Sequence, residues 1–201
     1  MSLSDYKVIV TGGPTREWID PVRYISNPSS GKMGIAIADE AQKRKCKTVF
    51  IHGPINNDLL KGKSFEIVPI ETTNDLLEEV LNNIQEKSVL IMAAAPADYK
   101  PVSKAEQKIK KNDSELIIKM EKNPDVLKNV ASKIEKNSIE NIFVVDFAAE
   151  TNDVEKHART KLDAKKLNMI CLNDVTRKGA RFGSDTNIIT IFKKEIVLGH
   201  F

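Results

Sequence analysis

Residues 88–95 read SVLIMAAA, a segment that is apolar at every position after the first serine. Parallel strands at the centre of a sheet are covered on both faces, so they carry continuous apolar runs instead of an alternating pattern. The three alanines at the end of the segment allow a flat ligand to approach the backbone closely. The segment therefore predicts a buried, central, parallel strand with a ligand near its carboxyl end.

Strand-like and helix-like segments alternate on both sides of this segment. Strands are expected at residues 7–13, 47–53, 65–70, 141–150 and 169–174, and helices at residues 31–45, 73–87, 123–137 and 153–168. This alternation is typical of a doubly wound, Rossmann-like α/β fold, with a mostly parallel sheet and helices on both faces. We expect residues 1–201 to form a single domain, since no linker or repeat divides the chain.

Two of the expected helices have clear N-cap signals. Thr73 or Asn74 is the candidate cap of the helix at residues 73–87. Asn123 is the candidate cap of the helix at residues 123–137, and Pro124 would take its first helical position.

Two segments interrupt the alternation. The segment at about residues 99–120 is polar and rich in lysine, and the turn sequence KNDS at residues 111–114 separates two alternating runs. This pattern predicts a β-hairpin flap beside the main sheet. Residues 187–199 indicate one or two further strands.

The composition is that of an ordinary globular protein: of 201 residues, 41% are hydrophobic and 29% are charged, and the net charge is +3. No dense basic tract favours nucleic-acid binding, and no apolar run approaches the roughly 20 residues that cross a membrane. We expect a cytoplasmic protein, because there is no signal-peptide pattern and Cys46 and Cys171 form no motif. The three histidines show no metal-binding spacing, and no nucleophile motif is present.

The connection after the first strand is long for a compact domain, which is typical of functional loops. It starts at Gly12 and Gly13 and contains Arg23 and Asn27. Ser29, Ser30, Gly31 and Lys32 then offer hydroxyls, free amide groups and a positive charge at a helix start, a combination that suits a phosphate. Simple helix capping by the serines is the commoner use of such residues, and both interpretations stay open.

Further candidate site residues lie near the ends of the central strand and of later strands and helices. Ala94, Ala95 and Asp98 follow the central strand, Phe147 stands near the end of the strand at residues 141–150, and Lys161 and Lys165 share one helix face. Each has a plain structural alternative, since Phe147 can fill the core and the lysines can lie on a solvated surface. Their convergence on one edge of the sheet favours a nucleotide site. The Walker A and GxGxxG motifs are absent.

Six motifs occur in a fixed order along the chain: TGGPTREWIDPVRYISNPSSGKMG, AAAPADYKP, KIKK, KNPDVL, DFAAET and LNDV. Together they resemble phosphopantothenoylcysteine synthetase, the bacterial CTP-dependent phosphopantothenate–cysteine ligase of coenzyme A biosynthesis. In many bacteria this ligase is the C-terminal half of a bifunctional protein whose other half is a flavin-dependent decarboxylase. The resemblance leaves open whether the chain is free-standing or part of such a protein.

The resemblance implies a two-step reaction. 4′-Phosphopantothenate and CTP would form an acyl-cytidylate and pyrophosphate, and the amine of L-cysteine would then displace CMP. Mg²⁺ is expected to neutralise the triphosphate, and CTP is a co-substrate. The expected partners are these substrates, a second copy in a homodimer, and a decarboxylase that is either fused or separate.

The resemblance also assigns roles to residues. The catalytic candidates are Asn27 and Lys108, and Lys108 belongs to the flap. The substrate-binding candidates are Arg23, Ser29, Ser30, Gly31, Lys32 and Ala95. The nucleotide-binding candidates are Gly12, Gly13, Ala94, Asp98, Lys108, Asn123, Pro124, Asp125, Val126, Phe147, Lys161 and Lys165. No metal ligand is assigned.

Two positions depart from the pattern of the family. Asp146 stands where a glycine is expected before FAAET, and Pro96 stands where an apolar residue is usual. The alternative function is a non-catalytic nucleotide-binding or regulatory module on the same fold. The presence of both Asn27 and Lys108 favours the ligase.

Overall fold

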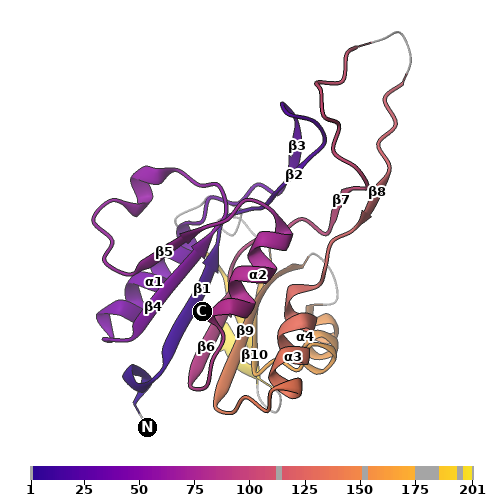
Figure 1. The fold of residues 1–201 in the computed structure, drawn as a ribbon. Coiled ribbons are helices and arrows are strands. Elements are labelled where there is room, and N and C mark those ends of the chain that lie inside the picture. Colours follow the sequence, from indigo (N-terminus) through magenta and orange to yellow (C-terminus); the bar gives the residue numbers. More distant parts are fainter. Residues whose placement is uncertain (1, 112–114, 151–153, 175–185, 194–196, 201) are drawn as a thin grey trace.

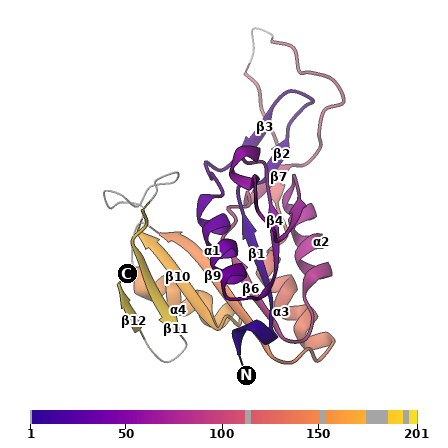
Figure 2. The same ribbon diagram turned by 90° about the vertical axis from the view of Figure 1, so that its left-hand side faces the viewer.

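The computed structural model describes residues 2–111, 115–150, 154–174, 186–193 and 197–200. In this part of the chain, eight strands form one sheet in the order β12-β11-β10-β9-β6-β1-β4-β5; Figure 1 labels the strands from β5 to β10, and Figure 2 labels β10, β11 and β12. The strands are β1 Lys7–Gly12, β4 Lys47–His52, β5 Glu66–Pro69, β6 Ser88–Met92, β9 Ile142–Glu150, β10 Met169–Asp174, β11 Ile189–Lys193 and β12 Val197–His200. The helices are α1 Lys32–Lys43, α2 Thr73–Asn83, α3 Val126–Lys136 and α4 Val154–Ala164, with short 3₁₀ turns η1 Leu3–Asp5 and η2 Asn57–Leu60.

The sheet confirms the expected doubly wound topology. β1 pairs in parallel with both β4 and β6, and the parallel order continues outward to β5 on one side and through β9 to β10 on the other. β11 pairs antiparallel with β10, and β12 antiparallel with β11, so the C-terminal segment supplies two further strands. The strand order reverses between β1 and β6. Doubly wound sheets bind ligands at this switch point, beyond the carboxyl ends of the strands.

Helices cover both faces of the sheet, as the apolar strands predict. Figure 2 shows α1 on one side of β1 and β4, and α2 on the other. One core lies beneath α2, α3 and α4 and includes Ile9, Leu76, Val80, Leu90, Val130 and Leu162. The other core lies beneath α1 and η2 and includes Val8, Val10, Ile35, Ala38, Phe50 and Phe65. Within the described residues, no helix is both long and apolar enough to cross a bilayer.

Both predicted N-caps are wrong by one or two residues. The cap of α2 is Thr72, whose hydroxyl accepts a hydrogen bond from the amide of Asp75 at 3.1 Å. The cap of α3 is Asp125, whose carboxylate accepts one from the amide of Lys128 at 3.1 Å. The predicted caps are Thr73 or Asn74 for α2 and Asn123 for α3, but the side chains of Thr73 and Asn123 bond to other segments at the edge of the sheet. Capping patterns alone cannot reveal that competition.

The loop after β1 contains a hairpin that the sequence did not predict. Its strands are β2 Arg16–Trp18 and β3 Tyr24–Ser26, which pair antiparallel. The hairpin extends beyond the carboxyl ends of the parallel strands, next to the flap (Figures 1 and 2). Each strand has three residues, too few for the period of two to emerge from a loop rich in proline and charge.

The flap is a hairpin only at its base. There β7 Tyr99–Pro101 pairs antiparallel with β8 Met120–Lys122. The described residues between these strands form no further strand, and the predicted turn KNDS has residues 112–114 outside the described part of the chain. Leu116 and Ile117 are exposed, so the apolar side chains of the alternating pattern there are not packed against the described part of the chain.

Candidate functional site

A cavity of about 1070 Å³ opens at the carboxyl edge of the sheet. Its wall is built from the loop before α1, the segment after β6, the start of α3, the interior of β9, and α4. The predicted residues that line it are Asn27, Ser29, Ser30, Gly31, Lys32, Ala94, Ala95, Asp98, Asn123, Pro124, Asp125, Val126, Phe147, Lys161 and Lys165. The tertiary structure thus brings most of the predicted site residues into one hollow, large enough for a nucleotide and a second substrate.

The serines before α1 do not cap the helix. The N-cap is Gly31, whose φ of 76° lies in the left-handed region. Gly31 has no side chain that could accept a hydrogen bond from the amides of the first helical turn. A Cβ at Gly31 would also lie 2.8 Å from Cγ2 of Ile55. Ser29 and Ser30 therefore line the cavity beside a helix start whose N-cap residue, a glycine, makes no side-chain cap. This arrangement favours an anion, because the helix dipole places partial positive charge there.

Asn27 connects two walls of the cavity. Its amide Nδ2 donates to the carbonyl oxygens of Ala95 at 3.3 Å and Pro96 at 3.0 Å. The amide of Ala95 donates in turn to the carbonyl oxygen of Gly13 at 2.9 Å. The loop after β1 and the segment after β6 are therefore held together at the switch point, and Pro96 takes part through its carbonyl group.

A buried polar network, which the sequence did not reveal, supports the floor of the cavity. The carboxylate of Glu17, 4% exposed, accepts hydrogen bonds from the amide of Thr73 at 2.9 Å and its hydroxyl at 2.7 Å. The hydroxyl of Thr15 lies 3.0 Å from that of Thr73 and accepts from the amide of Ala97 at 2.9 Å. Because these partners lie far apart in the sequence, no local motif marks them.

Asn123 joins this network and leaves one acceptor for a ligand. Its Nδ2 donates to the carbonyl oxygen of Ala97 at 2.8 Å and lies 3.2 Å from the hydroxyl of Thr73. Its Oδ1 is buried and has no hydrogen-bond partner among the residues that the structure describes. A buried acceptor without a partner costs free energy, so a donor from a ligand in the cavity would be favoured here.

The far wall of the cavity carries charges of both signs. Burial raises the pKa of Asp146 to about 6, although Lys165 and Lys161 act to lower it and Asp125 acts to raise it. Nζ of Lys165 lies 3.4 Å from Oδ2 of Asp125. The two lysines therefore belong to the cavity wall and not to a solvated helix surface, and the departure at Asp146 places a carboxyl among them.

Phe147 is a wall residue of the cavity and does not belong to the core. The predicted strand at residues 141–150 is confirmed as β9, and Phe147 lies within it. Its ring is half-buried and lines the cavity, where it can stack on a flat group.

Four predicted site residues lie outside the cavity wall. Gly12 is buried in β1, where a Cβ would lie 2.7 Å from the ring of Phe50, and Gly13 turns the chain with a φ of 78°. The structure therefore gives both glycines packing and turn roles. Arg23 lies in the tight turn of the β2–β3 hairpin, and Lys108 is exposed on the flap.

The described part of the chain gives little support to a cysteine nucleophile or to a metal site built from protein side chains alone. Cys46 and Cys171 are free and buried, and burial raises the pKa of the Cys171 thiol to about 12. No described group of three His, Cys, Asp or Glu side chains could hold a metal ion. The cavity does have the carboxylates of Asp98, Asp125 and Asp146 in its wall. This fits Mg²⁺, which commonly binds through one or two carboxylates together with substrate phosphates.

Fold and site together define a class: a doubly wound α/β domain with an anion-suited ligand cavity at its switch point. Within that class, the chain belongs to the family described as the DNA/pantothenate metabolism flavoprotein C-terminal domain, which matches residues 3–198.

The relatives agree with this family. The chain is 43% identical over 188 residues to the coenzyme A biosynthesis bifunctional protein CoaBC of Bacillus subtilis, covering 94% of this chain and 45% of that protein. It is 42% identical over 193 residues to CoaBC of Escherichia coli, covering 94% and 46%. The chain therefore spans about half the length of the curated relatives it matches.

Solved structures place the match in the C-terminal part of such proteins. The crystal structure of the C-terminal domain of CoaBC superimposes with a TM-score of 0.71 at 33% identity, covering 96% of this chain and 86% of that one. The DNA/pantothenate metabolism flavoprotein from Streptococcus pneumoniae gives a TM-score of 0.77 at 25% identity, covering 98% and 92%. The resemblance inferred from the motifs is confirmed at the level of the family.

Proposed function

We propose that this domain is a phosphopantothenate–cysteine ligase, which joins 4′-phosphopantothenate and L-cysteine through an acyl-cytidylate and releases CMP and pyrophosphate. One observation carries the proposal: a single cavity at the switch point collects an uncapped helix start, a backbone lined by alanines and a cationic helix face. Membership of the family supports the same conclusion.

The start of α1 is the proposed site for the phosphate of phosphopantothenate. Ser29 and Ser30 supply hydroxyls, Lys32 supplies a charge, and the first turn of the helix supplies amide donors. A glycine at position 31 keeps the approach open, since a Cβ would also impose strain at its positive φ.

CTP is proposed to bind across the remainder of the cavity. The ring of Phe147 would stack on the base, and Lys161 and Lys165 would pair with phosphates. Oδ1 of Asn123 would accept a hydrogen bond from the nucleotide. Mg²⁺, when bound to the triphosphate with help from Asp98, would neutralise phosphate charge.

The proposed chemistry needs orientation and charge stabilisation and no nucleophilic side chain. The carboxylate of phosphopantothenate attacks the α-phosphorus of CTP, and pyrophosphate leaves. The cysteine amine then attacks the acyl carbon, loses a proton, and CMP leaves. Asn27, anchored to Ala95 and Pro96, would orient the acyl group, and Lys108 would stabilise developing negative charge.

The proposal includes the partners of the reaction. Because the relatives are named as bifunctional coenzyme A biosynthesis proteins, we propose a phosphopantothenoylcysteine decarboxylase, fused or separate, as the enzyme that consumes the product. The same relatives support a cytoplasmic location. We also propose a homodimer, since Val22, Tyr24, Ile25, Leu116 and Ile117 expose apolar side chains on the projecting hairpin and flap.

The test is a reaction with 4′-phosphopantothenate, Mg²⁺ and either CTP or ATP, with and without L-cysteine, followed by mass spectrometry. We expect phosphopantothenoylcysteine and CMP only when cysteine and CTP are both present. Asn27→Ala should lower the yield at least about 100-fold, because a positioned group is lost. Asp58→Asn, an exposed carboxylate in η2, is the matched control and should leave the yield unchanged.

The alternative hypothesis, a non-catalytic nucleotide-binding module, predicts a different result. It predicts that the folded protein binds CTP or ATP without forming products under any of these conditions. That result would overturn the ligase proposal.

A further inference from the structure

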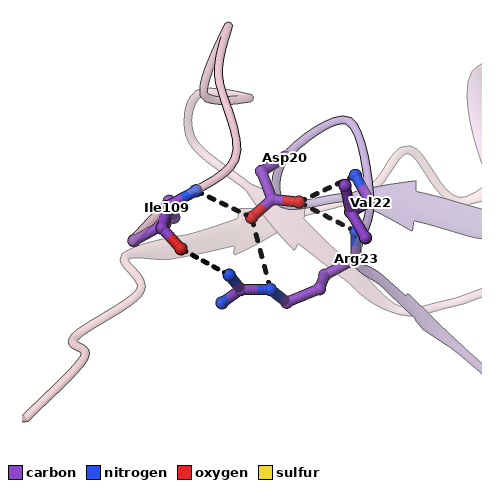
Figure 3. A network of polar contacts seen from close by, with 4 residues as sticks. All are labelled: Asp20, Val22, Arg23 and Ile109. Atoms are coloured by element: carbon purple, nitrogen blue, oxygen red, sulfur yellow. Dashed lines mark hydrogen bonds and ion pairs between the residues drawn. The ribbon is translucent and has the colours of Figure 1, made fainter. Parts of the chain in front are cut away.

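Asp20 joins the turn of the β2–β3 hairpin to the flap (Figure 3). Its Oδ1 accepts hydrogen bonds from the amides of Val22 at 2.8 Å and Arg23 at 2.9 Å. Its Oδ2 accepts one from the amide of Ile109, in the flap, at 3.2 Å and lies 3.4 Å from Nε of Arg23. Arg23 completes the ring, because its Nη2 donates to the carbonyl oxygen of Ile109 at 2.5 Å.

The β2–β3 hairpin and the flap between β7 and β8 together form an arm that projects from the domain. The carboxylate of Asp20 is fully buried within this arm, which is unusual for a charged group in a projecting part of a molecule. Its side chain is 0% exposed, although the elements on either side of it are short and partly solvated. Burial alone would raise its pKa, but the amides of Val22, Ile109 and Arg23 and the Arg23 guanidinium together lower the pKa below its usual value. A buried, charged and fully bonded carboxylate defines the geometry of its donors sharply.

Further contacts hold the same limb of the flap. The amide of Ala105 donates to the carbonyl oxygen of Ile19 at 2.9 Å, and Nζ of Lys104 lies 5.3 Å from the ring centre of Trp18. Beyond its three-residue base, by contrast, the described residues of the flap form one backbone hydrogen bond between its two limbs, from the amide of Val102 to the carbonyl oxygen of Lys119 at 3.0 Å. The described flap is thus positioned by the β2–β3 hairpin more than by its own pairing.

This arrangement bears on two of the four site candidates that lie outside the cavity wall, Arg23 and Lys108. Lys108 precedes Ile109, whose amide and carbonyl groups are both engaged, and Arg23 is held through its amide and its guanidinium. We propose that Asp20 is a positioning residue of the ligase, which sets Arg23 and Lys108 on one rigid arm in a fixed mutual geometry. The catalytic consequence rests on the proposed function; the geometry of the arm does not.

The experiment compares Asp20→Asn with Lys108→Met, with the double variant, and with Asp58→Asn as control. Asparagine keeps the size of Asp20 but removes its charge and one of its acceptors. A misplacement of about 1 Å can cost about 100-fold in rate. We expect Asp20→Asn to lower kcat about 10- to 100-fold while KM for CTP changes less than about 3-fold. In the Lys108→Met background, the same substitution should lower kcat by less than about 3-fold more, because the positioned group is already absent.

Trp18, the single tryptophan of the chain, supplies a readout independent of turnover. Asp20→Asn should shift its emission and expose the flap to limited proteolysis, and Lys108→Met and Asp58→Asn should do neither. Arg23→Lys removes the hydrogen bond from the guanidinium to Ile109, so it should give the same shift in Trp18 emission and the same cleavage of the flap. If Asp20→Asn fails to fold, Arg23→Lys is measured in its place.

Several results would overturn the inference. One is an Asp20→Asn enzyme with unchanged kcat and unchanged Trp18 emission; another is a loss of rate that multiplies fully with that of Lys108→Met. If the wild-type protein shows no turnover, the proposed function fails, and the emission and proteolysis results alone decide whether Asp20 holds the arm.

Discussion

At the scale of the residue, Asp146 is the clearest case of chemistry that depends on surroundings. In the sequence it is one aspartate among many, notable for standing where a glycine is expected. In the structure it lies in the cavity wall beside Phe147, with Lys161 and Lys165 nearby, and burial raises its pKa to about 6. Its charge near neutral pH therefore costs folding free energy that an uncharged side chain would not.

Replacing this carboxyl should stabilise the protein in a pH-dependent way. The folded-state pKa of Asp146 is raised, so its ionisation destabilises the fold as pH rises from about 4 to about 6, and the full penalty holds above 6. Asp146→Asn should therefore raise the free energy of unfolding by about 2 to 3 kcal/mol at pH 7.5 and change it little at pH 4. Urea unfolding at both pH values measures this. Asp163→Asn, an exposed carboxylate of α4, is the control, and an equal effect at both pH values would contradict the assignment.

At the scale of the element, the site depends on how the ends of strands and helices are joined. α1 begins beside the cavity at a glycine without a side-chain cap, whereas α2 and α3 begin with capped turns. Thr73, the first residue of α2, bonds to Glu17 of β2 and lies near Asn123. The start of one helix thus orders two loops of the cavity.

Removing the hydroxyl of Thr73 should weaken this junction. Thr73→Val keeps the shape of the side chain but removes the hydroxyl that donates a 2.7 Å hydrogen bond to the carboxylate of Glu17. Hydrogen bonds to charged groups contribute about 1.5–3 kcal/mol, so we expect a loss of about 2 kcal/mol in the free energy of unfolding. Denaturant unfolding measures it. Ser132→Ala removes a hydroxyl that bonds within its own helix, and it should cost less than about 0.5 kcal/mol. A loss no larger for Thr73→Val than for this control would contradict the role of Thr73.

At the scale of the whole molecule, two hairpins project beyond an otherwise compact sheet (Figures 1 and 2). Both hairpins carry candidate site residues and exposed apolar side chains. Asp20 joins the β2–β3 hairpin to the flap through its hydrogen bond with the amide of Ile109. The cavity lies in the body of the domain, and Lys108 lies in the arm. A second copy of the chain is the partner we propose for this apolar surface.

Sedimentation should reveal that association. We expect the wild-type protein to be a dimer at micromolar concentration and Ile117→Asp, whose native side chain is 85% exposed, to shift the equilibrium toward monomer. A charge in an apolar interface is desolvated without a partner, so we expect at least about a 10-fold weaker dimer. The unfolding temperature of the monomer should not fall, because the side chain lies outside both cores. Exposed Lys136→Glu in α3 is the control, and a wild-type protein that stays monomeric would contradict the prediction.

The sequence by itself determined the parallel strands, the helices between them and most of the cavity wall. Continuous apolar runs such as residues 88–92 record burial on both faces, and residues that follow parallel strands must meet at one edge. Only the tertiary structure decided the caps of α2 and α3, the β2–β3 hairpin and the place of Gly12, Gly13, Arg23 and Lys108. These depend on partners far apart in the chain: Asp20 meets Ile109 and Glu17 meets Thr73. A hydrogen bond across 56 or 89 residues leaves no local pattern, because its free energy is realised only when the fold brings both groups together.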